Sequence, residues 1–183
     1  AEGFSRGKPL KKLGLKGNDT AELFFDNVKI PLTNLIGNEE GQGFYQMMNQ
    51  LPWERLLIGI TALGAIDFAL QETIKYVQDR KAFGKRIMDL QNTRFKLAEA
   101  KTKAEVFRSF VNDCIARLIN GKLDAATASM AKYWGSQIQN EIMDECLQLH
   151  GGYGYILDYP ISRMYADARA VSYTHLRAHE TRS

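Results

Sequence analysis

The chain has 183 residues, of which 45% are hydrophobic, and its 24 basic and 21 acidic residues give a net charge of +3. This length and composition suffice for a globular core, and the scattered charges form no basic stripe of the kind that binds nucleic acid. The sequence offers no run of roughly 20 uncharged apolar residues, so we expect no membrane span.

Residues 1–36 contain the strand signals of the chain. Apolar residues 23–25 precede an Asp26-Asn27 turn, and the apolar pattern resumes at 28–30, which predicts a β-hairpin. The Gly- and Lys-rich stretch before it is typical of loops or short strands. Because so small a β segment cannot close a sheet alone, we expect it to be the end of a β domain whose remainder lies upstream.

After Gly37 the pattern becomes helical. Apolar residues recur at helical spacing until Pro52, which either interrupts the helix or opens a new one at its first turn. From there the pattern predicts one long helix, which ends at Gly84 and the basic residues beside it. Its predicted buried stripe is Leu56, Ile60, Leu63, Ile66, Leu70, Ile74 and Val77.

Three more helices follow. The second is predicted over residues 91–120, the third begins after the N-cap Asp124 and ends at Gly151, and a short fourth covers 161–170. Residues 37–170 are therefore predicted to form an up-down antiparallel four-helix bundle, which makes the chain mainly α. The third helix is expected to bury Ala128, Ala131, Trp134, Ile138, Ile142, Cys146 and Leu149.

The sequence contains no convincing metal or disulfide site. Cys114 and Cys146 are far apart and lack a ligand spacing, which fits a reducing intracellular compartment. His175 and His179 have the spacing of two metal ligands on one helix face, but they lie in residues 171–183. This tail resembles the translation of a transposase adapter from sequencing libraries, so we expect it to be non-native and give its histidines no weight.

Glu54, in the stretch "LPWERLLIG", is the first candidate for chemistry. An acid in a first helical turn complements the helix dipole, and the local pattern favours this structural role. The alternative is a general base, which needs an apolar, water-poor pocket that Leu51, Trp53 and Leu56 could supply.

Two further segments combine glycine with groups that bind anions. In "RKAFGK" (80–85), Arg80 could hold a phosphate and Phe83 could stack on a flat ring, or the segment is a basic helix end with a glycine cap. In "QLHGGYGY" (148–155), the glycine pair could place backbone amides against a pyrophosphate or ribose, or it only stops a helix.

One enzyme family contains these motifs in the same order. From Gly3 to about Ala170 the chain closely resembles the C-terminal half of the flavin-dependent acyl-CoA dehydrogenases. The motifs are "GLKGNDTAELFFDNVKIP", "GQGF", "ERL", "RKAFGK", "LQNTRFKLAE", "AKYW", "QLHGGYGY" and "YPISRMYADAR".

The resemblance implies a fold and an activity. Family members have an N-terminal helical domain, a middle β domain and a C-terminal four-helix bundle, and they assemble as a dimer of dimers. With FAD as cofactor they oxidise a fatty acyl-CoA to the trans-2-enoyl-CoA and pass electrons to an electron-transferring flavoprotein. The location implied is the cytoplasm, or the mitochondrial matrix in a eukaryote. An acyl-CoA oxidase-like flavoprotein and a non-catalytic assembly bundle remain alternatives.

The resemblance also assigns a base. The family carries it either on a loop after the "DAR" helix or in an "ER" pair at the start of the first bundle helix. The second pattern belongs to the long-chain and isovaleryl-CoA dehydrogenases, and it implies that Glu54 takes the α-proton. Arg55 would shape the electrostatics beside it, and Tyr45 and Trp53 would line the acyl-CoA side.

The cofactor residues follow in the same way. Arg80, Phe83 and Gln91 match residues that hold the pyrophosphate and adenine of FAD across a subunit boundary in this family. The segment that matches the cradle of the adenosine end consists of Gln148, Leu149, His150, Gly151 and Gly152.

Overall fold

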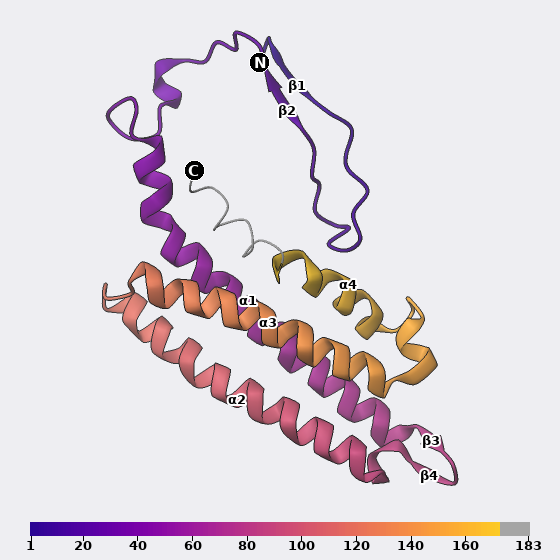
Figure 1. Ribbon diagram of the computed structural model, residues 1–183. Coiled ribbons are helices and arrows are strands. Elements are labelled where there is room, and N and C mark those ends of the chain that lie inside the picture. The colour runs from indigo at the N-terminus through magenta and orange to yellow at the C-terminus, as the bar shows by residue number, and fades with distance from the viewer. Residues whose placement is uncertain (173–183) are drawn as a thin grey trace, which may run out of the picture.

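The computed structural model describes residues 1–172 and consists mainly of four helices (Figure 1). Successive helices run in opposite directions, and the fourth is shorter than the others (Figure 1). The predicted mainly α fold with an up-down four-helix bundle is thus confirmed. The helices are α1 (Gly43–Asp79), α2 (Gln91–Ile119), α3 (Ala125–Leu149) and α4 (Pro160–Ser172).

The core lies mainly between α1, α2 and α3 and holds most of the predicted stripes, and α4 adds the buried side chains of Ile161 and Ala168. Phe107 of α2 is fully buried against Gly135 of α3, where an added Cβ would lie 2.5 Å from the ring. Gly59 likewise lets α1 approach Ala131 closely. Trp134, predicted to be buried, is 37% exposed, because it lies at the edge of the core and packs edge-on against Phe107.

Local signals fix where the helices begin and end. The Asp124 side chain accepts a hydrogen bond from the backbone N–H of Thr127 at 2.8 Å, so it is the N-cap of α3 as predicted. Gly121 and Gly151 have φ values of 66° and 58°, the left-handed backbone that glycine adopts without strain after a helix.

The N-terminal β segment pairs differently from the prediction. Strand β2 (Leu23–Phe25) pairs antiparallel with β1 (Phe4–Arg6), whereas residues 28–30 form no strand. The rings of Phe4 and Phe25 lie 5.2 Å apart across the two strands, and such a cross-strand aromatic pair stabilises this partner. A short 3-10 helix, η1 (Leu32–Asn34), follows.

Helix α1 differs from the prediction at two points. It continues through Pro52 without interruption, and Met48, whose carbonyl loses its helical partner there, lies in an exposed turn that water can solvate. It ends at Asp79 rather than at Gly84, because a tight hairpin of β3 (Lys81–Ala82) and β4 (Lys85–Arg86) follows. Gly84 is a turn residue of that hairpin and not a helix cap. The 3-10 helix η2 (Ile87–Asp89) leads into α2.

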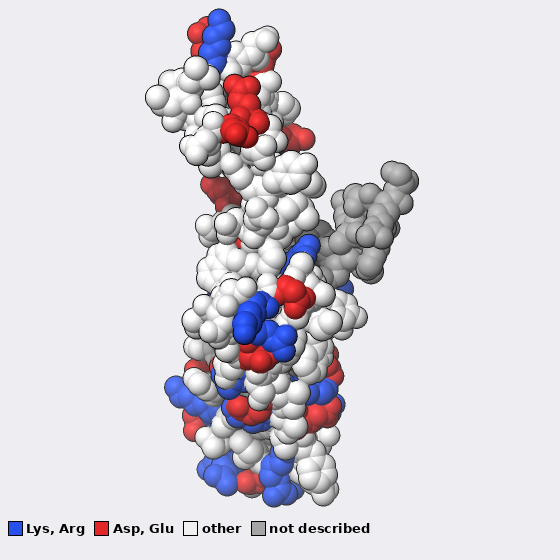
Figure 2. All heavy atoms as spheres, turned by 90° about the vertical axis from the view of Figure 1, so that its left-hand side faces the viewer, with Lys and Arg blue, Asp and Glu red and all other residues white. Residues whose placement is uncertain are grey.

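The first turns of α1 project beyond the bundle (Figure 1). Figure 2 shows mostly uncharged atoms between the upper tip of the molecule and the bundle, whereas the bundle carries charges of both signs. By length and composition α1 is the one described helix that could cross a membrane. This is weak evidence, because helices buried in protein cores pass the same test.

Candidate functional site

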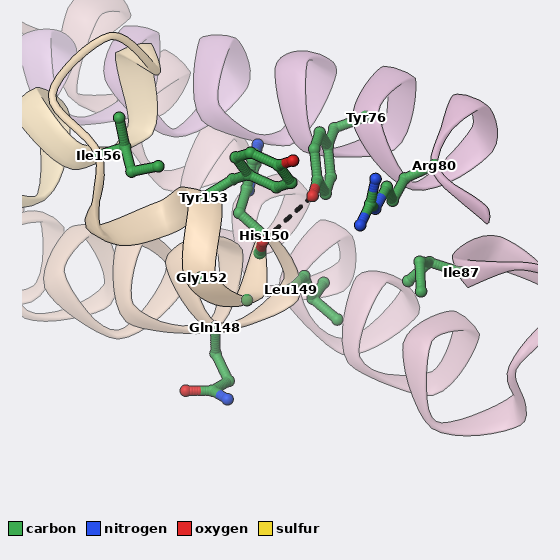
Figure 3. Close-up of a pocket in the computed structure, with 10 residues that line it drawn as sticks. Tyr76, Arg80, Ile87, Gln148, Leu149, His150, Gly152, Tyr153 and Ile156 are labelled. Carbon is green, nitrogen blue, oxygen red and sulfur yellow. Dashed lines mark hydrogen bonds between the residues drawn. The ribbon is translucent and has the colours of Figure 1, made fainter. Parts of the chain in front are cut away.

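A pocket of about 620 Å³ lies where the C-terminal end of α1 meets the C-terminal end of α3 (Figure 3). It brings Arg80 together with the whole predicted segment 148–152, although these residues are far apart in the sequence. The 3-10 helix η3 (Gly151–Tyr155) forms another wall. The lining residues are Tyr76, Arg80, Ile87, Gln148, Leu149, His150, Gly151, Gly152, Tyr153 and Ile156.

The end of α3 fixes the conformation of His150. Its backbone N–H donates to the carbonyl of Leu147 at 3.1 Å, and its ring Nδ1 lies 2.8 Å from the carbonyl of Cys146. Because a carbonyl can only accept, Nδ1 must carry the hydrogen. Burial lowers the pKa of His150, so the ring is neutral at pH 7.

Aromatic side chains and one cation form the wall beside the glycine pair. The ring of Tyr76 stacks on that of His150 with centroids 4.2 Å apart, and its hydroxyl donates to the His150 carbonyl at 3.1 Å. Burial raises the pKa of Tyr76, which keeps the phenol a donor. The guanidinium of Arg80 lies 5.1 Å from the ring centroid of Tyr153. Figure 3 shows these four side chains together, while that of Gln148 points away from them.

This arrangement fits one end of a dinucleotide cofactor. A pocket of about 620 Å³ is within the range of small-molecule sites. Arg80 forms no salt bridge with any residue in the described part of the chain, so its charge is available to a phosphate. An added Cβ at Gly152 would meet nothing within 4 Å, which leaves its backbone open to a ligand. The aromatic rings offer flat surfaces to a purine.

Two predicted cofactor residues lie outside this pocket. Phe83 is at the turn of the β3–β4 hairpin, where its side chain is 91% exposed and its φ is 55°. Gln91 is the exposed first residue of α2. Within one chain the structure therefore does not bring Phe83 and Gln91 to Arg80 and the glycine pair.

Glu54 lies toward the opposite end of α1. At 1.5 Å of rise per residue, it is about 39 Å along the helix axis from Arg80. Glu54 is exposed, so the apolar enclosure expected around it is not formed by the described residues. The reason is geometric: Leu56, two positions on, faces nearly the opposite side and is buried in the bundle.

Of the other residues predicted for this end of α1, Arg55 is held by a hydrogen bond, whereas Tyr45 and Trp53 are exposed. Arg55 is half-buried, and its Nη1 donates to the Ser129 hydroxyl of α3 at 2.9 Å. Tyr45 and Trp53, the predicted substrate residues, are 63% and 43% exposed. The described chain thus orients Arg55 but leaves Glu54, Tyr45 and Trp53 exposed.

Tyr76 and Tyr153 form two aromatic walls of the pocket that the sequence motifs did not indicate. The position of Tyr76 was a usable signal, because it precedes Arg80 by four residues and so lies on the same helix face. Tyr153 directly follows the glycine pair. His175 and His179, which were given no weight as metal ligands, lie outside the described residues.

A comparison with known protein families shows to which family the chain belongs. Residues 41–174 match the family model of the acyl-CoA dehydrogenase C-terminal domain, which is more than half of the chain. The chain belongs to the acyl-CoA dehydrogenase family. The resemblance expected from the motifs is confirmed.

Similar proteins show how much of a longer protein this chain matches. The chain is 51% identical to the rat mitochondrial long-chain specific acyl-CoA dehydrogenase, over 92% of this chain and 39% of the relative. It is 41% identical to the caffeyl-CoA reductase-Etf complex subunit CarC of Acetobacterium woodii, over 92% of this chain and 44% of the relative. The crystal structure of an acyl-CoA dehydrogenase from Geobacillus kaustophilus superimposes with a TM-score of 0.86 at 40% identity, covering 96% of this chain and 49% of that one. The chain therefore spans less than half the length of these relatives.

Proposed function

We propose that this chain forms the C-terminal part of an FAD-dependent acyl-CoA dehydrogenase that oxidises a long-chain fatty acyl-CoA to the trans-2-enoyl-CoA. The observation that carries the proposal is the pocket that unites Arg80 with residues 148–152. The similarity to the rat long-chain enzyme supports the substrate class.

The residues of the pocket bind and orient the cofactor. Arg80 pairs with a phosphate, the open backbone at Gly151 and Gly152 admits a phosphate or ribose, and the ring of Tyr153 offers a flat contact to the adenine. When bound, FAD supplies the acceptor for the hydride that leaves the β-carbon.

Glu54 removes the proton from the α-carbon of the thioester. A carboxylate takes such a proton effectively when water is excluded and its own proton affinity is raised. Since the described chain leaves Glu54 exposed, its cover comes from surfaces beyond residues 1–172 or from another copy of the chain. The distance of about 39 Å between Glu54 and Arg80 along α1 favours a site completed by a second copy. The dimer of dimers implied by the resemblance stays a prediction.

The electron acceptor is the least constrained part of the proposal. The name of the related caffeyl-CoA reductase-Etf complex subunit supports an electron-transferring flavoprotein as partner. An acyl-CoA oxidase-like activity is a second candidate, because the chain also superimposes on the prolyl acyl carrier protein oxidase AnaB with a TM-score of 0.84 at 26% identity. The expected location, a reducing compartment such as the cytoplasm or the mitochondrial matrix, stays a prediction.

A flavin titration of the full-length gene product tests the function. We expect the purified protein to bind FAD and its flavin absorbance to be bleached without oxygen by a long-chain acyl-CoA more effectively than by a short-chain one. Reoxidation by an electron-transferring flavoprotein but not by oxygen identifies a dehydrogenase, and rapid reoxidation by oxygen identifies an oxidase. Absence of FAD binding, or no bleaching by any acyl-CoA, would contradict the proposal.

A further inference from the structure

We propose that Tyr76 is a positioning residue of the cofactor pocket, an inference that rests on the function proposed above. Tyr76 lies on α1 one turn before Arg80 and contacts His150, the residue directly before the glycine pair. Its ring stacks on the imidazole at a centroid distance of 4.2 Å and an interplanar angle of 20°, and its hydroxyl donates to the His150 carbonyl at 3.1 Å. One side chain therefore holds both the main chain and the side chain at the end of α3.

The hydrogen bond matters because of where the carbonyl lies. The last carbonyls of a helix have no partner within the helix, and His150 caps the C-terminal end of α3. Glycine restricts the backbone least, and Gly151 turns the chain with a φ of 58°. Because the peptide group is planar, fixing the His150 carbonyl also fixes the N–H of Gly151. Tyr76 thereby orients the backbone with which the glycine pair meets a ligand.

The same ring also supports the other wall of the pocket. It makes an edge contact with Tyr153 at a centroid distance of 6.5 Å and another with Tyr159 at 6.1 Å. Arg80 lies over Tyr153, so the cation and the ring beneath it are both placed relative to Tyr76. Tyr76 thus links the two predicted cofactor segments, residues 80–85 and 148–155. It lies just before the first segment and far from the second in the sequence.

The substitution Tyr76→Phe separates the hydrogen bond from the stacking, because it keeps the ring and removes the hydroxyl. In the full-length gene product we expect FAD binding to weaken by about 2- to 10-fold, as for the loss of one hydrogen bond. Amide hydrogen exchange of residues 148–155 in the FAD-free protein should become faster. Tyr165→Phe on α4, where the side chain is 44% exposed, is the matched control and should change none of these quantities.

The outcomes separate this inference from the proposed function. Unchanged FAD affinity and unchanged exchange in Tyr76→Phe would overturn the positioning role, and so would a lower melting temperature at unchanged FAD affinity. If the wild type itself bound no FAD, the proposed function would fail. Faster exchange of residues 148–155 in the variant would then still support Tyr76 as the residue that orients this segment.

Discussion

The two ends of α1 differ in how much of a binding site this chain supplies. At the C-terminal end, Tyr76 and Arg80 meet the end of α3, and the described residues form a pocket of about 620 Å³. At the N-terminal end, Glu54 is exposed and the first turns of the helix extend beyond the bundle (Figure 1). Under the proposed function, the bundle therefore supplies a formed pocket for one end of the cofactor, but only the proposed base, Glu54, at the other end of α1.

The proposed function assigns cofactor binding to one end of α1 and proton transfer to the other. Residues at the pocket end should affect how tightly FAD binds and leave the chemical step nearly intact. Glu54 should affect the chemical step and leave FAD affinity nearly intact. Substitutions at each end, with both quantities measured, can confirm or break this division.

The largest effect is expected at Glu54. Glu54→Gln keeps the size of the side chain but removes the base, so turnover of acyl-CoA should fall by about 10²- to 10⁴-fold while FAD affinity stays the same. Stopped-flow bleaching of the flavin measures the step. Glu40→Gln, at an exposed acid just before α1, is the control. Unchanged turnover in Glu54→Gln would favour a base after α4, or the assembly role.

The packed bundle and the projecting turns should respond differently to the loss of a phenylalanine. Phe107 is fully buried whereas Phe44 is 64% exposed, so Phe107→Ala should cost about 3–5 kcal/mol of unfolding free energy and Phe44→Ala about 0.5 kcal/mol or less. Denaturant unfolding of the chain provides both values. A comparable cost at Phe44 would show that the projecting turns are packed against another surface.

Arg80→Gln should weaken FAD binding without slowing the saturated enzyme. Losing one charge-assisted contact to a phosphate costs about 1.5–3 kcal/mol, which is roughly a 10- to 100-fold change in Kd. Isothermal titration of the FAD-free protein measures it. Arg117→Gln, which removes only an exposed ion pair with Asp113, should bind FAD like the wild type. A fall in kcat at saturating FAD would break the division between the two ends.

The smallest effect concerns acid stability at the pocket end. Burial lowers the pKa of His150 below its ordinary 6.5, and Glu72 opposes this shift. As the pH falls below about 6.5, the His150 ring therefore takes up a proton more readily in the unfolded chain than in the folded one. The contribution of His150 to stability is therefore complete above about pH 6.5 and is lost as the pH falls, by at most about 1.4 kcal/mol per pH unit. Melting temperatures between pH 7.5 and 5.5 should show this slope in the wild type and a smaller one in His150→Gln. Equal slopes would argue against a buried neutral ring.

The sequence predicted those features that depend on local patterns. The extents of α2 and α3 followed from long apolar periodicity, and the start of α3 followed from Asp124. The partner of strand β2 was predicted wrongly, because pairing with residues 4–6 depends on contacts between distant segments. The hairpin at 81–86 was also missed, because its basic residues are equally typical of a helix end.

Most residues of the candidate site that lie in recognisable sequence motifs were predicted, and those outside such motifs were not. Arg80 and residues 148–152, both expected to contact FAD, line one pocket, and their role there stays a prediction. Tyr76 was not singled out, because a tyrosine within a helical apolar pattern resembles a core residue. The enclosure of Glu54 could not be judged from its neighbours in sequence. On a helix those neighbours face other directions, and the described residues leave Glu54 exposed.

The most direct test of the central claim is the structure of the full-length gene product with FAD bound. We predict that the phosphate and adenine end of FAD contacts Arg80 and the backbone of residues 148–152 of one subunit, with the Tyr76–His150 stack intact beside it. A well-defined FAD whose phosphates and adenine lie away from this pocket, leaving Arg80 and the glycine pair in solvent, would contradict the claim.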